Sequence, residues 1–84
     1  MAITKLLLET LRMADGGKVV CEVKSPDGVL RSVIEQSFFE DFMGVPNPEL
    51  TPQRQSRIVE ENIAYLEAEA ERLWLMGNRE LVIR

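Results

Sequence analysis

Five glutamates in one stretch of the chain have the clearest capacity for chemistry: Glu60, Glu61, Glu67, Glu69 and Glu71. On a helix, Glu60, Glu67 and Glu71 lie on roughly one face. Such carboxylates can bind a divalent cation or imitate the phosphates of a nucleic acid. A cation site needs ligands that converge, generally from more than one segment, and the sequence shows no second carboxylate cluster. We therefore expect a solvated helix face and no metal site.

The groups that most enzymes use are largely missing from the sequence. The 84 residues include no histidine, which removes the common general base near neutral pH and the commonest metal ligand. The single cysteine, Cys21, cannot form a disulfide within the chain or build a zinc site. Val19 and Val23 share its face and nothing beside it in the sequence lowers a thiol pKa, so we expect a buried structural cysteine. We expect no catalytic site and no cofactor.

Length and composition predict one globular domain over residues 1–84. Hydrophobic residues make up 45% of the chain and charged residues 29%, which is typical of a folded domain and not of a disordered one. The net charge of −4 argues against nucleic-acid binding, which usually requires a basic surface. No stretch approaches the roughly 20 apolar residues that span a bilayer, and the first residues lack a secretory-signal pattern. With the single cysteine, these features predict a cytoplasmic protein.

A long helix over residues 52–76 is the clearest predicted element. Thr51 can cap its start, Pro52 fits its first position, and Gly77 and Asn78 follow its end. Hydrophobic residues recur at helical spacing and form a stripe: Val59, Ile63, Leu66, Ala70 and Leu73. We expect the stripe to pack on the rest of the domain, and the polar first turns, PQRQSR, to project into water.

Shorter elements precede and follow this helix. KVVCEVKS and VLRSVIEQ alternate around the turn PDG and predict a hairpin, and RELVIR predicts a short C-terminal strand. Residues 2–14 fit either a helix or the first arm of another hairpin that turns at Asp-Gly-Gly, and we favour a strand from about residue 6. SFFEDFMG predicts a helix of about two turns with a capping box from Ser37 to Glu40. VPNPEL predicts an extended linker.

Together these elements predict an α+β domain. We expect a small, mainly antiparallel sheet of about three to four strands, covered on one face by the long C-terminal helix and the short helix. The order of a GGKVVCEV strand, a capped short helix, a long helix and a closing GNRELVIR strand resembles a family of short bacterial proteins catalogued as a domain of unknown function, with a β-β-α-α-β arrangement. The resemblance covers most of residues 6–84 and implies a fold without an assigned chemistry. The segment KSPDGVLRSV adds a strand to that arrangement, so the strand order stays open.

A surplus of apolar residues around the two helices points to a protein–protein interface. In RLWLMGN, the side chains of residues 73–76 point to most sides of the helix, so one core cannot cover them all. Either the short helix folds over residues 73–76 and the two cover each other, or these side chains contact a second copy or another protein. The candidate interface residues are Phe38, Phe42, Trp74, Leu75 and Met76.

The sequence therefore predicts a small non-catalytic interaction module, homodimeric in its simplest form, with no nucleic-acid or membrane partner. A second hypothesis is an acidic inhibitor, for example phage-encoded, that imitates a nucleic acid with its glutamate face. A third is a carboxylate-dependent enzyme or metal binder. Reversing the charges of Glu60, Glu67 and Glu71 tests the second hypothesis, and thermal shifts with divalent cations test the metal-binding form of the third.

Overall fold

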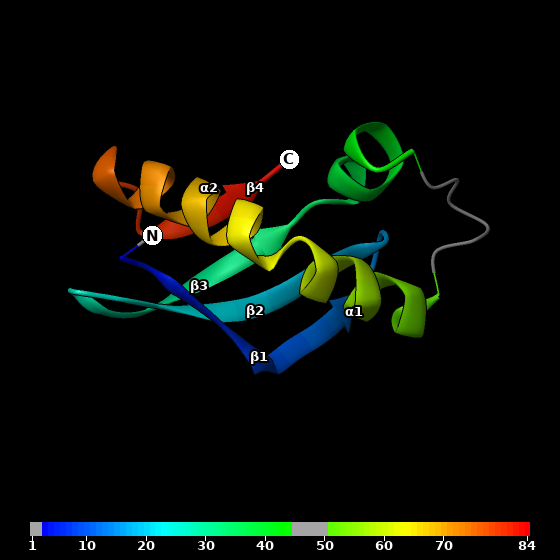
Figure 1. The fold of residues 1–84 in the computed structure, drawn as a ribbon, viewed down its shortest axis with the longest axis horizontal. Helices are drawn as coiled ribbons and strands as arrows, with labels where there is room; N and C mark the ends of the chain where they lie inside the picture. Colours follow the sequence, from blue (N-terminus) through cyan, green and yellow to red (C-terminus); the bar gives the residue numbers. More distant parts are fainter. Residues whose placement is uncertain (1–2, 45–50) are drawn as a thin grey trace.

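Three consecutive strands form the antiparallel part of a four-stranded mixed sheet (Figure 1). The computed structural model describes residues 3–44 and 51–84, so the predicted linker VPNPEL lies outside the described residues. β1 (Lys5–Ala14), β2 (Lys18–Ser25) and β3 (Gly28–Ile34) are joined by tight turns. Gly16 and Gly17 adopt φ values of +82° and +75° in the first turn, which side chains other than glycine rarely allow. The strand interpretation of the N-terminal segment is therefore confirmed from Lys5 onward.

The register of β2 and β3 places Val19, Cys21 and Ile34 on one face, as the alternation predicts. Cys21 lies opposite Ser32, and Val19 lies opposite Ile34. All four side chains are fully buried. Burial raises the pKa of the Cys21 thiol from 9.0 to about 11. The predicted burial of Cys21 is confirmed.

The pairing of β1 with β2 is interrupted in the middle of β1. The register shifts between Leu7 and Arg12, which is a bulge-like irregularity. The Thr10 hydroxyl bridges the gap, because it accepts the Glu22 backbone N–H at 2.8 Å and donates to the Leu7 carbonyl at 2.6 Å. A side chain thus replaces the backbone partner that the irregularity removes.

The C-terminal strand, β4 (Glu80–Ile83), pairs in parallel with β3, and the strand order is β1-β2-β3-β4. A parallel pair needs a long crossover connection, which here contains the helices. The predicted C-terminal strand is confirmed. Of the three strand pairs, two are antiparallel and one is parallel, so the sheet is mixed.

Two helices stand where the sequence predicts one. α1 (Pro52–Glu61) and α2 (Ile63–Leu75) are separated at Asn62, whose φ of −117° and ψ of 23° are not helical. The Asn62 side-chain amide donates to the Ile58 carbonyl at 2.9 Å. The prediction of one continuous helix over residues 52–76 is wrong at this residue, because its backbone dihedral angles interrupt the helix. The Thr51 cap is confirmed, because its hydroxyl accepts the Arg54 N–H at 3.2 Å.

The short helix η1 (Phe38–Phe42) winds more widely than an α-helix. The Met43 N–H donates to the Phe38 carbonyl, five residues back, at 3.1 Å. Ser37 makes no side-chain cap bond, so the predicted capping box is wrong. Glu40 instead accepts a hydrogen bond from the Gln36 amide at 2.8 Å.

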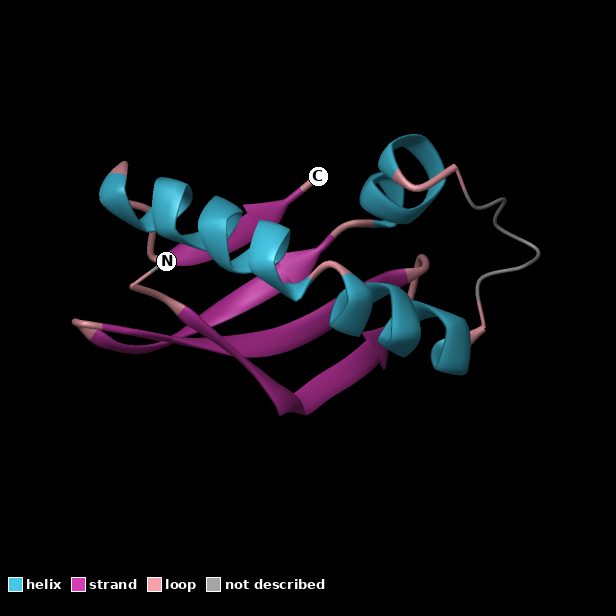
Figure 2. Ribbon diagram, viewed as in Figure 1, coloured by secondary structure: helices cyan, strands magenta, loops and turns pink. Residues whose placement is uncertain are grey.

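The core lies between the sheet and the helices (Figure 2). The stripe predicted for the long helix contributes Val59, Leu66 and Ala70, all fully buried. Gln55 is also buried, and its amide donates to the Gly17 carbonyl at 2.7 Å. The expectation that the whole segment PQRQSR projects into water is therefore wrong at Gln55. In the described part of the chain, no helix combines the length and the apolar character that crossing a membrane requires.

Candidate protein-interaction surface

The aromatic residues of η1 pack against the start of α2. Phe38 is fully buried and belongs to the core. Phe42 is 55% exposed and stacks on Tyr65, with ring centroids 4.8 Å apart. Figure 1 shows η1 at one end of the molecule and the C-terminal end of α2 at the other. The short helix therefore does not cover residues 73–76.

The three candidate residues at the end of α2 face different directions. Trp74 is partly buried, and its indole N–H donates to the Asp27 carboxylate at 2.8 Å. Leu75 and Met76 are each 67% exposed. Because successive helical residues turn by about 100°, Leu75 and Met76 cannot both lie beside the same neighbouring strand. Phe42 is thus exposed in one region, and Leu75 and Met76 are exposed in another.

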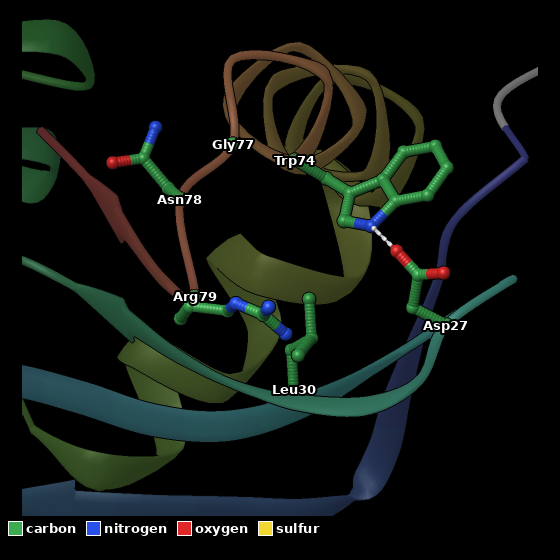
Figure 3. Close-up of a pocket in the computed structure, with 6 residues that line it drawn as sticks. All are labelled: Asp27, Leu30, Trp74, Gly77, Asn78 and Arg79. Carbon is green, nitrogen blue, oxygen red and sulfur yellow. Dashed lines mark hydrogen bonds between the residues drawn. The ribbon is translucent and has the colours of Figure 1, made fainter.

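Trp74 closes one side of a cleft of about 410 Å³ between the end of α2 and the β2–β3 turn (Figure 3). The other residues that line the cleft are Asp27, Leu30, Gly77, Asn78 and Arg79. Figure 3 shows the indole nitrogen pointing at the Asp27 carboxylate, so the most polar atom of Trp74 is bonded within its own chain. In the residues that the structure describes, no group of three or more His, Cys, Asp or Glu side chains is placed to hold a metal ion.

The start of the β1 edge is held by two glutamates of α2. The Glu67 carboxylate accepts the Leu6 N–H at 2.9 Å, and the Glu71 carboxylate accepts the Ile3 N–H at 3.3 Å. The Thr4 hydroxyl also donates to the Glu67 carbonyl at 2.6 Å. An unpaired sheet edge is a template for another strand, and at the start of β1 the Leu6 N–H of this template is occupied. Two of the predicted solvated glutamates therefore hold the edge of the sheet.

Within the described residues, the outer edge of β4 lacks such contacts. The Glu35 N–H donates to the Ile83 carbonyl at 2.8 Å, so the backbone groups of Ile83 face β3. In a parallel pair the next residue points its groups away, so the N–H and carbonyl of Val82 face outward. Across residues 3–44 and 51–84, no side chain or strand is hydrogen-bonded to these Val82 groups.

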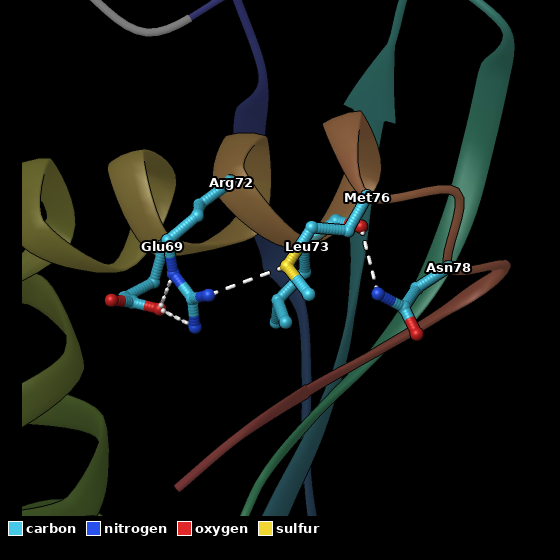
Figure 4. A network of polar contacts seen from close by, with 5 residues as sticks. All are labelled: Glu69, Arg72, Leu73, Met76 and Asn78. Carbon is cyan, nitrogen blue, oxygen red and sulfur yellow. Dashed lines mark hydrogen bonds and ion pairs between the residues drawn. The ribbon is translucent and has the colours of Figure 1, made fainter.

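A row of α2 side chains lies along the β4 edge (Figure 4). Arg72 pairs with Glu69 at 2.9 Å, and its guanidinium also donates to the Met76 sulfur at 3.4 Å. Beyond Met76, the Asn78 amide donates to the Leu73 carbonyl at 2.9 Å and fixes the turn into β4. A groove of about 340 Å³ runs between α2 and β4, lined by Tyr65, Glu69, Arg72, Leu73, Val82, Ile83 and Arg84.

We name this region the edge surface. It combines the outer edge of β4, the adjoining row of α2 and the exposed ring of η1, and its residues are Phe42, Tyr65, Glu69, Arg72, Met76, Glu80, Val82 and Arg84. Sequence reasoning selected Phe42 and Met76 but missed the others. The spacing of four, three and four residues from Tyr65 through Glu69 and Arg72 to Met76 is the signal that predicts a second helix face.

No protein-family model matches the chain, and neither a curated protein nor a solved structure matches it. The resemblance to the β-β-α-α-β family stays a prediction. The geometry of the edge surface is therefore the basis for assigning a function.

Proposed function

We propose that the protein is a non-catalytic interaction module that binds another protein chain, in the simplest case a second copy of itself, through the edge surface. The observation that supports this most strongly is the contrast between the two edges of the sheet. Glu67 and Glu71 bind the backbone at and just before the start of β1, whereas in the described part of the chain the Val82 backbone groups at the β4 edge have no partner and can bind an added strand. Phe42 and Met76 supply exposed apolar contacts beside it.

The size of a stable interface requires the helix as well as the strand. A typical interface takes about 800 Å² from each partner, roughly a sixth of the 5078 Å² surface of this chain. β4 has only four residues, so the α2 row and Phe42 must contribute. We further infer that α1 and α2 cover a single face of the sheet. A strand added at β4 then extends both the covered face and the uncovered face.

Hydrogen exchange at low and high protein concentration tests the proposal. Association through the edge surface should slow amide exchange in residues 80–84 as concentration rises, because their outward N–H groups become hydrogen-bonded. Exchange at the β2–β3 turn, which lies outside the edge surface, should stay the same. Protection that rises only at another surface would contradict the proposal.

A matched pair of variants provides the control. Phe42 and Val29 are 55% and 54% exposed, but only Phe42 belongs to the edge surface. Phe42→Ser should weaken self-association at least about tenfold, as expected for an aromatic residue inside an interface. Val29→Ser should change it less than about twofold, and the thermal stability of each monomer reports any effect on folding. Equal effects of the two variants would argue against the edge surface.

The acidic-inhibitor hypothesis has weaker support. It needs Glu60, Glu67 and Glu71 to be available to a partner, but the last two accept hydrogen bonds from the backbone of residues 3–6. Reversing their charge would also expose the edge of β1, so any loss of binding in such variants must be compared with their stability.

A further inference from the structure

The partner of the β4 edge can be specified by its register, an inference that rests on the proposed function of the edge surface. We propose that β4 pairs antiparallel with β4 of a second copy, with the twofold axis at Val82. The two four-stranded sheets then form one continuous sheet of eight strands. Closed twofold pairing is the commonest way in which identical chains associate.

The backbone limits the registers that are possible. Because Ile83 bonds to β3, the outward-facing groups belong to Val82 and, by alternation, to Glu80 and Arg84. Hydrogen-bonded pairs in an antiparallel ladder join residues whose groups both face the partner. An axis at Val82 pairs this residue with its own copy and pairs Glu80 with Arg84 twice. A register shifted by two residues places Glu80 opposite Val82 and leaves fewer hydrogen-bonded pairs between the two strands.

The charges at the two ends of β4 fit the same register. Charged residues on an edge strand usually prevent association, but here the signs differ. Antiparallel pairing about Val82 places each Glu80 opposite an Arg84, and opposite charges across strands are favourable. Glu80 already lies 3.4 Å from Arg31, and both side chains are more than half exposed. Its carboxylate therefore stays accessible to a second guanidinium.

The apolar residues beside β4 also match. α2 ends at the turn that leads into β4, so Met76 lies near the start of the strand. Tyr65 lines the groove together with Arg84 near the end of the strand, and Phe42 stacks on Tyr65. Antiparallel pairing therefore brings Met76 of each copy toward the Tyr65 and Phe42 rings of the other. Contacts between methionine sulfur and aromatic rings are favourable, and both exposed regions become covered.

Charge exchange across the axis tests this register. Glu80→Arg and Arg84→Glu each create two like-charge pairs and should weaken dimerisation at least about tenfold at low ionic strength, where charges are least screened. The double variant Glu80→Arg/Arg84→Glu restores opposite charges and should return to within about threefold of the wild type. Arg79→Glu is the control for Arg84→Glu, because it makes the same change in net charge at the Trp74 cleft. It should change the dissociation constant less than about twofold.

The outcomes separate this inference from the proposed function. Sedimentation equilibrium that shows recovery in the double variant supports the register. If the wild type dimerises and the double variant remains as weak as the single variants, the register is wrong while the edge surface stands. A wild-type chain that is monomeric at every concentration overturns the inference. A peptide experiment then tests the edge surface itself. Extended peptides selected from a random displayed library are added to the protein. If they do not slow amide exchange in residues 80–84, the edge surface also fails as a strand-binding site.

Discussion

Replacing Phe38 with alanine should destabilise the protein far more than the same change at Phe42, one helical turn away. Phe38 is fully buried and contacts the rings of Phe39, Phe42 and Tyr65 at centroid distances of 5.3, 5.3 and 6.1 Å. Truncating a buried phenylalanine typically costs about 3–5 kcal/mol. Phe42 is 55% exposed, and burying a whole phenylalanine contributes about 1.5–3 kcal/mol. We therefore expect a loss of about 1 kcal/mol for Phe42→Ala.

The expected difference is large compared with the total stability. At about 0.05–0.15 kcal/mol per residue, a chain of 84 residues has a free energy of unfolding of about 4–13 kcal/mol. Urea denaturation at 25 °C, followed by circular dichroism at a protein concentration where the chain is monomeric, measures both variants. Phe38→Leu, which keeps most of the volume, should fall between them. A loss below about 1 kcal/mol for Phe38→Ala, or equal losses for the two alanine variants, would refute the placement of Phe38 in the core.

Three further changes test other parts of the fold through urea unfolding. Because burial raises the pKa of the Cys21 thiol from 9.0 to about 11, the thiol of the unfolded chain ionises first as the pH rises. The stability of the wild type relative to Cys21→Ala should therefore fall by about 2–3 kcal/mol between pH 9 and 11 and then level off. A constant difference would contradict this. Thr10→Val removes the hydroxyl that bridges β1 and β2 and should cost about 1–3 kcal/mol, whereas Thr10→Ser should cost less. Trp74→Phe removes the donor to Asp27 and should cost about 0.5–1.5 kcal/mol; no loss would show that this bond does not hold the β2–β3 turn to α2.

The strands were predictable because their signals are local. Alternation around tight glycine turns predicts β2 and β3, and the same alternation places Cys21 in the core. The C-terminal strand follows from its β-rich composition. Its position beside β3, in parallel, depends on how the crossover packs, and no local pattern contains that information.

The helices show where local patterns are insufficient. Strong helix formers on both sides of Asn62 hide the break at this residue, where the side chain also donates to the Ile58 carbonyl. Gln55 is polar, yet it is buried, and its amide donates to the Gly17 carbonyl in a distant turn. The candidate interface was partly predictable. Phe42 and Met76 could be selected from the sequence, but the open edge of β4 between them follows only from the strand order.

The claim that β4 pairs with β4 of a second copy is tested most directly by the molar mass of the wild type and of Val82→Pro, measured by light scattering over a range of concentrations. Proline removes the outward N–H of Val82 but no hydrogen bond to β3, and edge strands tolerate it at such positions. We predict about 19 kDa for the wild type at high concentration, twice the 9.6 kDa of one chain. Val82→Pro should remain folded at 9.6 kDa. A wild type at 9.6 kDa throughout, or a Val82→Pro variant that still dimerises, would contradict the claim.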